Sequence, residues 1–177
     1  MRPHVSALYV ARNSIYKQLG LDSWDIDRDA RAFAGPGPVI AHPPCGHWGR
    51  YAHSCRLPGK DCGPIAMEQV RKYGGVLEHP TSSRLFEYCG TPREPGQYDL
   101  YGGMIIRLNQ CDWGHEAEKS TCLYVVGLTS PPRLTPCRPS ARRRPCERLT
   151  SGARSRTPLP FALLLLCLAS QVEVPSP

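Results

Sequence analysis

Short apolar runs recur along the first two thirds of the chain, separated by polar segments rich in Gly, Pro and charged residues. The runs are only a few residues long and contain many β-branched and aromatic side chains, a pattern typical of buried strands rather than helices. The expected strands are 5–10, 23–26, 39–41, 76–78, 104–108 and 123–126.

Helical patterns lie between several of these runs. Pro64 can occupy the first turn of a helix over 64–72, and Gly74 and Gly75 can end it. Two shorter helices are expected over 13–20 and 82–88. Strand, helix and strand in this order predict an α/β domain with a Rossmann-like, mostly parallel sheet and flanking helices.

The last third of the chain has a different composition. Residues 1–128 form the predicted domain, 129–158 a Pro- and Arg-rich linker, and 159–171 a C-terminal helix that docks back on the domain. The extension is therefore expected to be irregular before this helix begins.

The net charge of +7 lies almost entirely in this extension. Residues 1–130 hold 14 Lys and Arg against 13 Asp and Glu, whereas residues 131–177 hold 8 Arg against 2 Glu. A basic arm of this kind can contact nucleic acid phosphates, and Arg142, Arg143 and Arg144 are its candidate contacts. The alternative is a solvated linker with no partner.

Nine cysteines follow an N-terminus that has no apolar signal segment, so we interpret them as reduced thiols in the cytoplasm of a bacterial host. The apolar run 161–169 is too short to cross a membrane. Zinc is an alternative chemistry, but the spacings do not form the paired pattern of a zinc site, and no metal site is predicted. The residues concerned are Cys45, His47, His53, Cys55 and Cys62.

Two motifs stand where predicted strands end. His42-Pro43-Pro44-Cys45 follows the strand 39–41, and Glu78-His79-Pro80 follows 76–77. In parallel α/β sheets, sites form beyond the carboxyl ends of strands, so the two motifs are expected to share one site.

Each motif has a chemical role under a stated condition. Cys45 is a nucleophile if nearby cations, such as those of His47, Arg50 or His53, lower its pKa. Glu78 is a proton donor or base if burial raises its pKa. Without the other motif, each is better explained as a rigid loop with an inert thiol and as a surface carboxylate at a turn.

A third cluster lies between the last two predicted strands. It combines amide, aromatic, imidazole and ammonium groups, which suit contact with a base or a phosphate. The alternative is a loop packed by its own tryptophan. The candidate nucleic-acid contacts are Gln110, Trp113, His115 and Lys119.

Read together, the three motifs resemble phage-type cytosine-C5 DNA methyltransferases. The order is Pro43-Pro44-Cys45, then Glu78-x-Pro80, then Gln110-x-x-Trp113-Gly-His115-x3-Lys119-x-Thr121-Cys122-Leu123. The resemblance covers roughly residues 39–127, with weaker similarity at 5–27 and 154–170. Short phage and prophage proteins share this layout.

The resemblance implies that Cys45 attacks C6 of a flipped cytosine, that Glu78 protonates the ring nitrogen, and that S-adenosylmethionine supplies a methyl group. The resemblance, with the strand ends, gives the cofactor-binding candidates Asp25, Asp27, His42 and Pro43. The sequence departs from the family in the segment 10–14, which has no glycine, and at His79, where the family has Asn. A catalytically inactive relative that binds nucleic acid or a host protein therefore remains the alternative.

Overall fold

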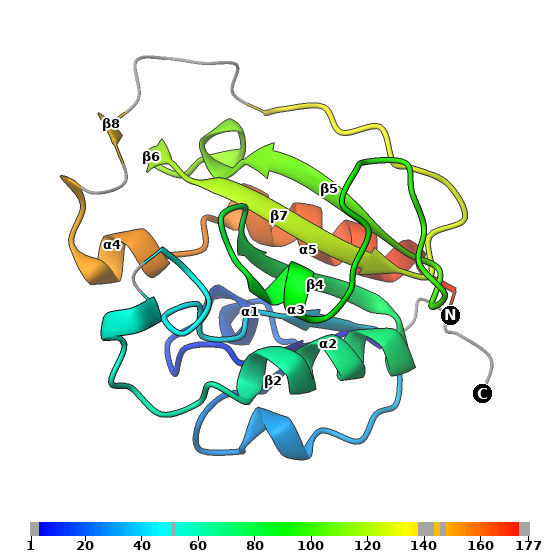
Figure 1. Ribbon diagram of the computed structural model, residues 1–177, viewed down its shortest axis with the longest axis horizontal. Coiled ribbons are helices and arrows are strands. Elements are labelled where there is room, and N and C mark those ends of the chain that lie inside the picture. Colours follow the sequence, from blue (N-terminus) through cyan, green and yellow to red (C-terminus); the bar gives the residue numbers. More distant parts are fainter. Residues whose placement is uncertain (1–3, 51, 138–143, 146–147, 174–177) are drawn as a thin grey trace.

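A computed structural model describes residues 4–50, 52–137, 144–145 and 148–173, and it shows a mixed α/β protein (Figure 1). One six-stranded sheet forms the centre of the molecule. Its strands are β1 (Ser6–Leu8), β2 (Asp22–Trp24), β3 (Val39–Ala41), β4 (Gly75–Pro80), β5 (Gly103–Asn109) and β7 (Ser120–Val126).

The strands lie in the order β2-β1-β3-β4-β7-β5. The first four are mutually parallel, whereas β7 runs antiparallel to both β4 and β5. This architecture confirms the expected mostly parallel sheet and is compatible with a Rossmann-like fold. The insertion of β7 between β4 and β5 was not predicted.

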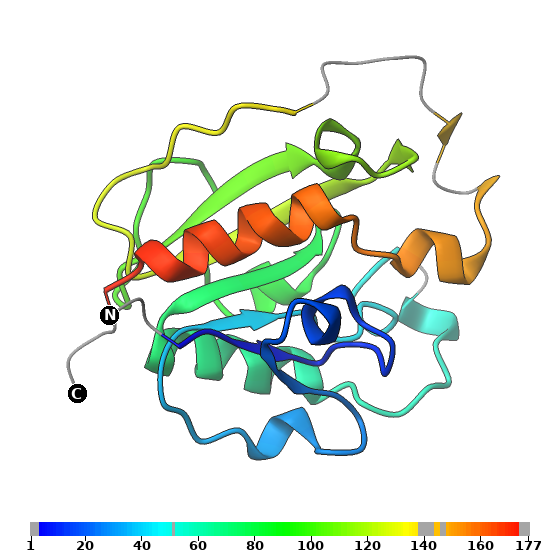
Figure 2. The same cartoon turned by 180° about the vertical axis from the view of Figure 1, so that it is seen from behind.

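Helices cover both faces of this sheet. Figure 1 shows α2 (Cys62–Tyr73) and α3 (Leu85–Tyr88) on one face. Figure 2 shows α5 (Leu159–Gln171) and α1 (Ile15–Gln18) on the other. The predicted docking of the C-terminal helix is therefore confirmed. Although α5 is apolar, no helix in the described ranges has the length and hydrophobicity needed to span a bilayer.

The alternation of side chains along the strands produces two hydrophobic cores. Ile40, Val76 and Leu123 pack on the α1 and α5 face, where Phe161 and Leu165 are fully buried. The residues between them face the opposite way and pack against α2 and α3. This second set includes Val39, Ala41, Leu77, Tyr124 and Val126.

A glycine pair allows β4 to begin directly after α2. Gly74 ends the helix with a φ of 73°, as the sequence indicated, and Gly75 follows with a φ of 119°. A Cβ atom at Gly75 would overlap the backbone of Val39 on the neighbouring strand. This close approach fixes the start of β4 and thereby the position of Glu78 at its other end.

Short elements complete the chain. In the predicted linker, β8 (Arg144–Pro145) pairs with β6 (Ala117–Glu118), and α4 (Ser151–Ser155) is capped by Thr150. The segment 129–158 therefore contains regular structure that its composition did not predict. The remaining elements are the single-turn helices η1 (Ala30–Ala32), η2 (Ala52–Ser54) and η3 (Gln110–Trp113).

Candidate functional site

Glu78 is the centre of a buried polar network at the carboxyl end of β4. It is only 8% exposed and faces the α1 side of the sheet, where its Oε2 lies 3.0 Å from Nδ1 of His42. Gln110 donates from Nε2 to the other carboxylate oxygen, at 2.8 Å, and to Oγ1 of Thr121, at 2.9 Å. The other three members of the network, His42, Gln110 and Thr121, come from the loop that follows β3, from η3 and from β7. The network therefore forms only in the folded protein.

Tyr16 extends this network. Its hydroxyl lies 2.9 Å from Nε2 of His42, and complete burial together with the Glu78 charge raises the pKa of the phenol, so the phenol stays protonated. An ionised carboxylate only accepts hydrogen bonds, so Nδ1 of His42 carries a hydrogen and donates to Glu78.

Glu78 is ionised in this arrangement. Burial alone would raise its pKa, but the charge of Lys119 and the His42 hydrogen bond lower it to about 2. The proton-donor role proposed from the sequence required a raised pKa, and the direction found is the opposite. In the free protein Glu78 is a hydrogen-bond acceptor, and its protonation would have to follow ligand binding.

Cys45 lies in the loop that leaves the adjacent strand, β3. Its carbonyl accepts the N–H groups of Trp48, at 3.0 Å, and Gly49, at 2.9 Å, and these bonds shape the turn after the two prolines. The residue is exposed, although its thiol is partly surrounded by protein. This desolvation and the Glu78 charge raise the pKa of Cys45, and Lys119 partly offsets the increase. The condition set for a nucleophile, a lowered pKa, is therefore not met in the free protein.

His79 points to the opposite face of the sheet from Glu78. It is 1% exposed, its ring lies edge-on to Phe86, and neither ring nitrogen has a hydrogen-bond partner within bonding geometry. Burial lowers its pKa to about 4, against opposing contributions from Glu78 and the carbonyls of Pro43 and Pro44. A neutral imidazole thus fills the space beneath the Pro43-Pro44 corner.

The predicted cofactor residues at the end of β2 are already engaged. Asp25 is 4% exposed and accepts from the Lys17 ammonium at 2.5 Å and from the backbone N–H groups of Asp27 and Arg28. The Lys17 hydrogen bond is the main cause that lowers the pKa of Asp25 to about 2. Asp27 is exposed and pairs with Arg12 at 2.6 Å.

The turn after β1 also differs from the pattern of the resembling family. Tyr9 adopts a φ of 58°, a left-handed conformation that glycine adopts more readily, and its hydroxyl donates to Gln69 of α2. The turn after β1 thus contains a tyrosine in the left-handed region. Pro43 is buried, and His42 uses both ring nitrogens inside the Glu78 network.

The predicted nucleic-acid contacts separate into buried and exposed groups. Trp113 is 7% exposed within the α5-side core, and His115 is 6% exposed with Nδ1 next to the backbone of Ala117. Gln110 belongs to the Glu78 network, so only Lys119 is partly exposed. In this conformation the loop is packed by its own tryptophan, the alternative considered from the sequence. The role of these four residues in nucleic-acid binding stays a prediction.

The structure describes only part of the basic arm. Arg142 and Arg143 lie outside the described residues, and of Arg144 the structure gives the backbone pairing in β8. The cysteines in the described ranges are free thiols. Cys55 and His47 approach to 3.7 Å, but no group of three or more potential ligands in that part of the chain is placed to hold a metal ion.

Tyr16 and Thr121 complete the site without having been predicted as site residues. Thr121 stands in the motif that carries the resemblance, so its position gave a usable signal. Tyr16 gave none, because a tyrosine in a short amphipathic helix is indistinguishable from a core residue until the fold brings it to His42.

Comparison with models of known protein families gave no match. No curated protein matched the chain either. The fold and the site define the class: a mixed α/β protein with a cysteine in the loop after β3 and a buried, ionised glutamate in the adjacent parallel strand β4. Glu78 therefore lies inside the strand, paired with Leu123 of β7, and does not follow its end as the sequence predicts.

Proposed function

We propose that this chain is a cytosine-C5 methyltransferase-like protein that engages a cytosine base of DNA at Cys45 and Glu78. The observation that carries the proposal is the placement of a thiol and an ionised carboxylate at the ends of β3 and β4, which pair directly. The Tyr16–His42 chain and Gln110 hold the carboxylate in one orientation. Such support is what a site needs to position a small planar ligand.

Cytosine offers the complementary groups. Its exocyclic amine is a donor for the Glu78 carboxylate, which can accept further hydrogen bonds beside those from His42 and Gln110. The adjacent Cys45 thiolate can then add to C6, forming the S–C6 bond while C5 takes a proton from solvent. Reversal removes a proton from C5 and releases the thiolate. This cycle needs no other reactant.

S-adenosylmethionine is the methyl donor that the family resemblance implies, but the residues expected to hold it do not fit it here. The acceptor atoms of Asp25 are taken up by Lys17 and two backbone amides, and both nitrogens of His42 are used in the Glu78 network. We therefore derive no methyl-transfer step.

The poor fit of Asp25 and His42 to S-adenosylmethionine favours a second candidate function. In this alternative the chain is a catalytically inactive relative that binds nucleic acid, or a host protein, through the same edge of the sheet. The raised pKa of Cys45 also fits it, because an inactive relative has no need of a reactive thiolate.

Hydrogen exchange at cytosine C5 tests the first proposal. The protein is incubated in D₂O with single-stranded DNA of random sequence, which avoids choosing a target, and deuterium in recovered deoxycytidine is measured by mass spectrometry. We expect deuterium at C5 with the parent protein and none with Cys45→Ser. Cys137→Ser, which changes another exposed thiol, should behave as the parent.

Calorimetric titration with S-adenosylmethionine separates the two candidates further. Saturable binding at micromolar strength would support a methyltransferase and contradict the poor fit of the Asp25 region. No binding at millimolar cofactor, together with no exchange, would leave the inactive relative as the function.

A further inference from the structure

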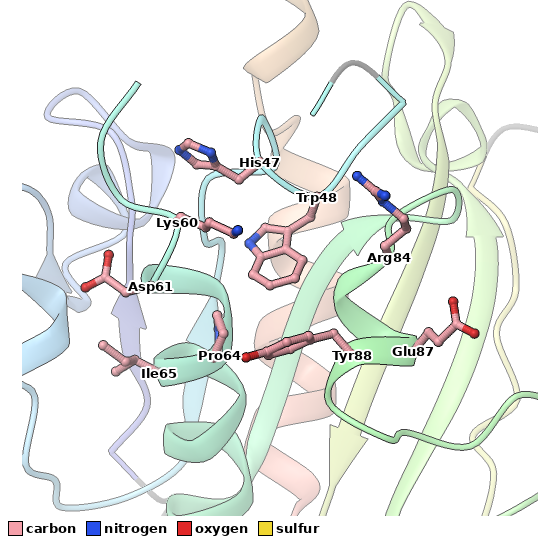
Figure 3. Close-up of a pocket in the computed structure, with 9 residues that line it drawn as sticks. All are labelled: His47, Trp48, Lys60, Asp61, Pro64, Ile65, Arg84, Glu87 and Tyr88. Carbon is pink, nitrogen blue, oxygen red and sulfur yellow. The ribbon is translucent and has the colours of Figure 1, made fainter. Parts of the chain in front are cut away.

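A large open pocket lies on the α2 and α3 face, away from the Glu78 network. Its volume is about 800 Å³, and it lies between the loop after Cys45, the first turn of α2 and the start of α3 (Figure 3). This volume is in the range of small-molecule sites. The side chains that matter most are His47, Trp48, Lys60, Arg84 and Tyr88.

The charges around this pocket are unbalanced. Its two acids have cationic partners: Asp61 pairs with Arg31 at 3.0 Å, and Glu87 pairs with Arg93 at 3.4 Å. Within the described part of the chain, the side chains of Lys60 and Arg84 have neither an acidic partner nor a hydrogen bond. Two cations are therefore available to an anionic ligand.

A donor without a partner lies in the same wall. Trp48 is 6% exposed, and its indole N–H makes no hydrogen bond. Figure 3 shows the indole nitrogen on the Lys60 side of the ring. The ring rests on Gly63 in the first turn of the twelve-residue helix α2, whose N-terminal end also favours negative charge.

The pocket also presents an aromatic surface. Tyr88 is 70% exposed, an unusual position for a tyrosine, and its ring centroid lies 5.1 Å from that of Trp48. An exposed ring held against a second aromatic ring is a ready stacking surface for a nucleobase.

The geometry points to a nucleoside-phosphate site, in which the phosphate lies between Lys60 and Arg84 and the base stacks on Tyr88. The site is tied to the loop of Cys45, since the Trp48 backbone N–H donates to the Cys45 carbonyl and that of Arg84 donates to the Trp48 carbonyl at 2.9 Å. The ligand is either a free nucleotide or a nucleotide of a strand next to the engaged base. That the ligand belongs to a DNA strand rests on the proposed function. That the pocket binds a nucleoside phosphate does not depend on the proposed function.

Binding of a fluorescein-labelled single-stranded oligonucleotide, followed by anisotropy, tests this site in the intact chain. The double variant Lys60→Gln/Arg84→Gln should bind about tenfold more weakly, and its salt dependence should fall by about 0.7 in log–log slope for each phosphate that the variant no longer neutralises. Tyr88→Ala should weaken binding at least about fivefold without changing that slope. Both variants alter exposed side chains, and unchanged thermal unfolding will confirm that they fold.

The matched control is Lys72→Gln/Arg12→Gln, which removes the same charge from exposed positions whose ionic partners do not line the pocket. Equal affinity and slope in this control and in Lys60→Gln/Arg84→Gln would overturn the proposal. Saturable binding of dCMP with the same variant pattern identifies a free nucleotide as sufficient, and binding of the oligonucleotide alone identifies a strand. Inorganic phosphate binding as tightly as dCMP would overturn the base-stacking part.

The outcomes also separate this site from the proposed function. Cys45→Ser should lose cytosine exchange, and in its background the pocket variants should still weaken oligonucleotide binding by the same factors. If cytosine C5 exchange persists and the pocket variants bind the oligonucleotide as tightly as the parent, the nucleotide site in the pocket is contradicted and the proposed function is not. Binding that follows the pocket variants without any exchange contradicts the proposed function alone.

Discussion

The ends of β2 and β4 hold two carboxylates that look alike and are built differently. Asp25 directly follows β2, and Glu78 lies inside β4 towards its carboxyl end. Both are buried, and the pKa of each is lowered to about 2. Asp25 reaches this state through Lys17 and the backbone of the next residues along the chain. Glu78 reaches it through the charge of Lys119 and the hydrogen bond from His42, both distant along the chain, while Gln110 donates to its other oxygen.

This difference separates scaffold from site. A carboxylate that accepts from nearby backbone amides stabilises a turn, and its charge is compensated by groups close to it in the sequence. A carboxylate held by side chains from three separate segments is positioned by the whole fold, at the cost of desolvating a charge. Asp25 therefore stabilises the turn after β2, and Glu78 is the carboxylate to which we propose a role in ligand chemistry.

The largest effect expected at the β4 end is a loss of stability in acid. The pKa of His79 is lowered to about 4 by burial, so the unfolded chain binds a proton more readily than the native state. The stability is complete above pH 6.5 and falls as the pH drops towards 4, by an amount on the order of 3 kcal/mol. Urea unfolding across this range should show the loss in the parent and not in His79→Asn. A parallel loss in both proteins would contradict the burial of a neutral imidazole.

Neutralising Glu78 is expected to cost a similar amount. Glu78→Gln keeps the shape but removes the charge that Lys119 and His42 stabilise, so unfolding at pH 7 should require on the order of 3 kcal/mol less free energy. The parent should lose this contribution as the pH falls from 4.5 towards 2, and the variant should not. Glu87→Gln, at an exposed carboxylate, is the control. It should change neither the free energy of unfolding at pH 7 nor its decrease between pH 4.5 and 2.

A smaller effect should appear in the reactivity of Cys45. Because the Glu78 charge raises the pKa of this thiol and Lys119 lowers it, Glu78→Gln should increase the thiolate fraction at pH 8 and Lys119→Gln should decrease it. A change of about half a pKa unit alters that fraction about threefold. Iodoacetamide labelling, quantified on the Cys45 peptide with Cys137 and Cys167 as internal references, measures both changes. The same direction in the two variants would refute the assigned charges.

The exposed pair at the β2 end should give no measurable effect. Arg12→Gln breaks the ion pair with Asp27, in which both side chains are more than half exposed. Thermal unfolding and Cys45 labelling should both match the parent. A clear change in Cys45 labelling would mean that the carboxyl ends of β2 and β4 are coupled. It would contradict the separation of these two strand ends into scaffold and site.

The sequence predicted individual elements better than their arrangement. Continuous apolar runs such as 39–41 and 123–126 are typical of strands buried on both faces, so these strands were placed close to their observed bounds. The position of β7 between β4 and β5 depends on pairing between distant segments, which local patterns do not encode. The rule that sites form at strand ends selected β3 and β4, which are adjacent in the sheet, and a shared site of Cys45 and Glu78 stays a prediction.

The chemistry of the site was harder to predict than its location. Trp113 had the sequence context of a ligand contact, but its burial depends on how α5 packs against η3. The pKa of Glu78 depends on the balance between burial and the partners Lys119 and His42, so even its direction required the folded structure. Lys60, Arg84 and Tyr88 carried no motif, because they meet only when α2 and α3 lie side by side.

Cytosine C5–deuterium exchange in Glu78→Gln and Asp25→Asn, measured with the same random single-stranded DNA, tests the central claim most directly. Asn at position 25 can still accept the backbone hydrogen bonds of the turn, so we expect that variant to retain the Cys45-dependent exchange of the parent. Glu78→Gln should lose exchange even though its Cys45 is labelled faster. Exchange that survives in Glu78→Gln, or that disappears equally in Asp25→Asn, would contradict the assignment of ligand chemistry to the β4 end.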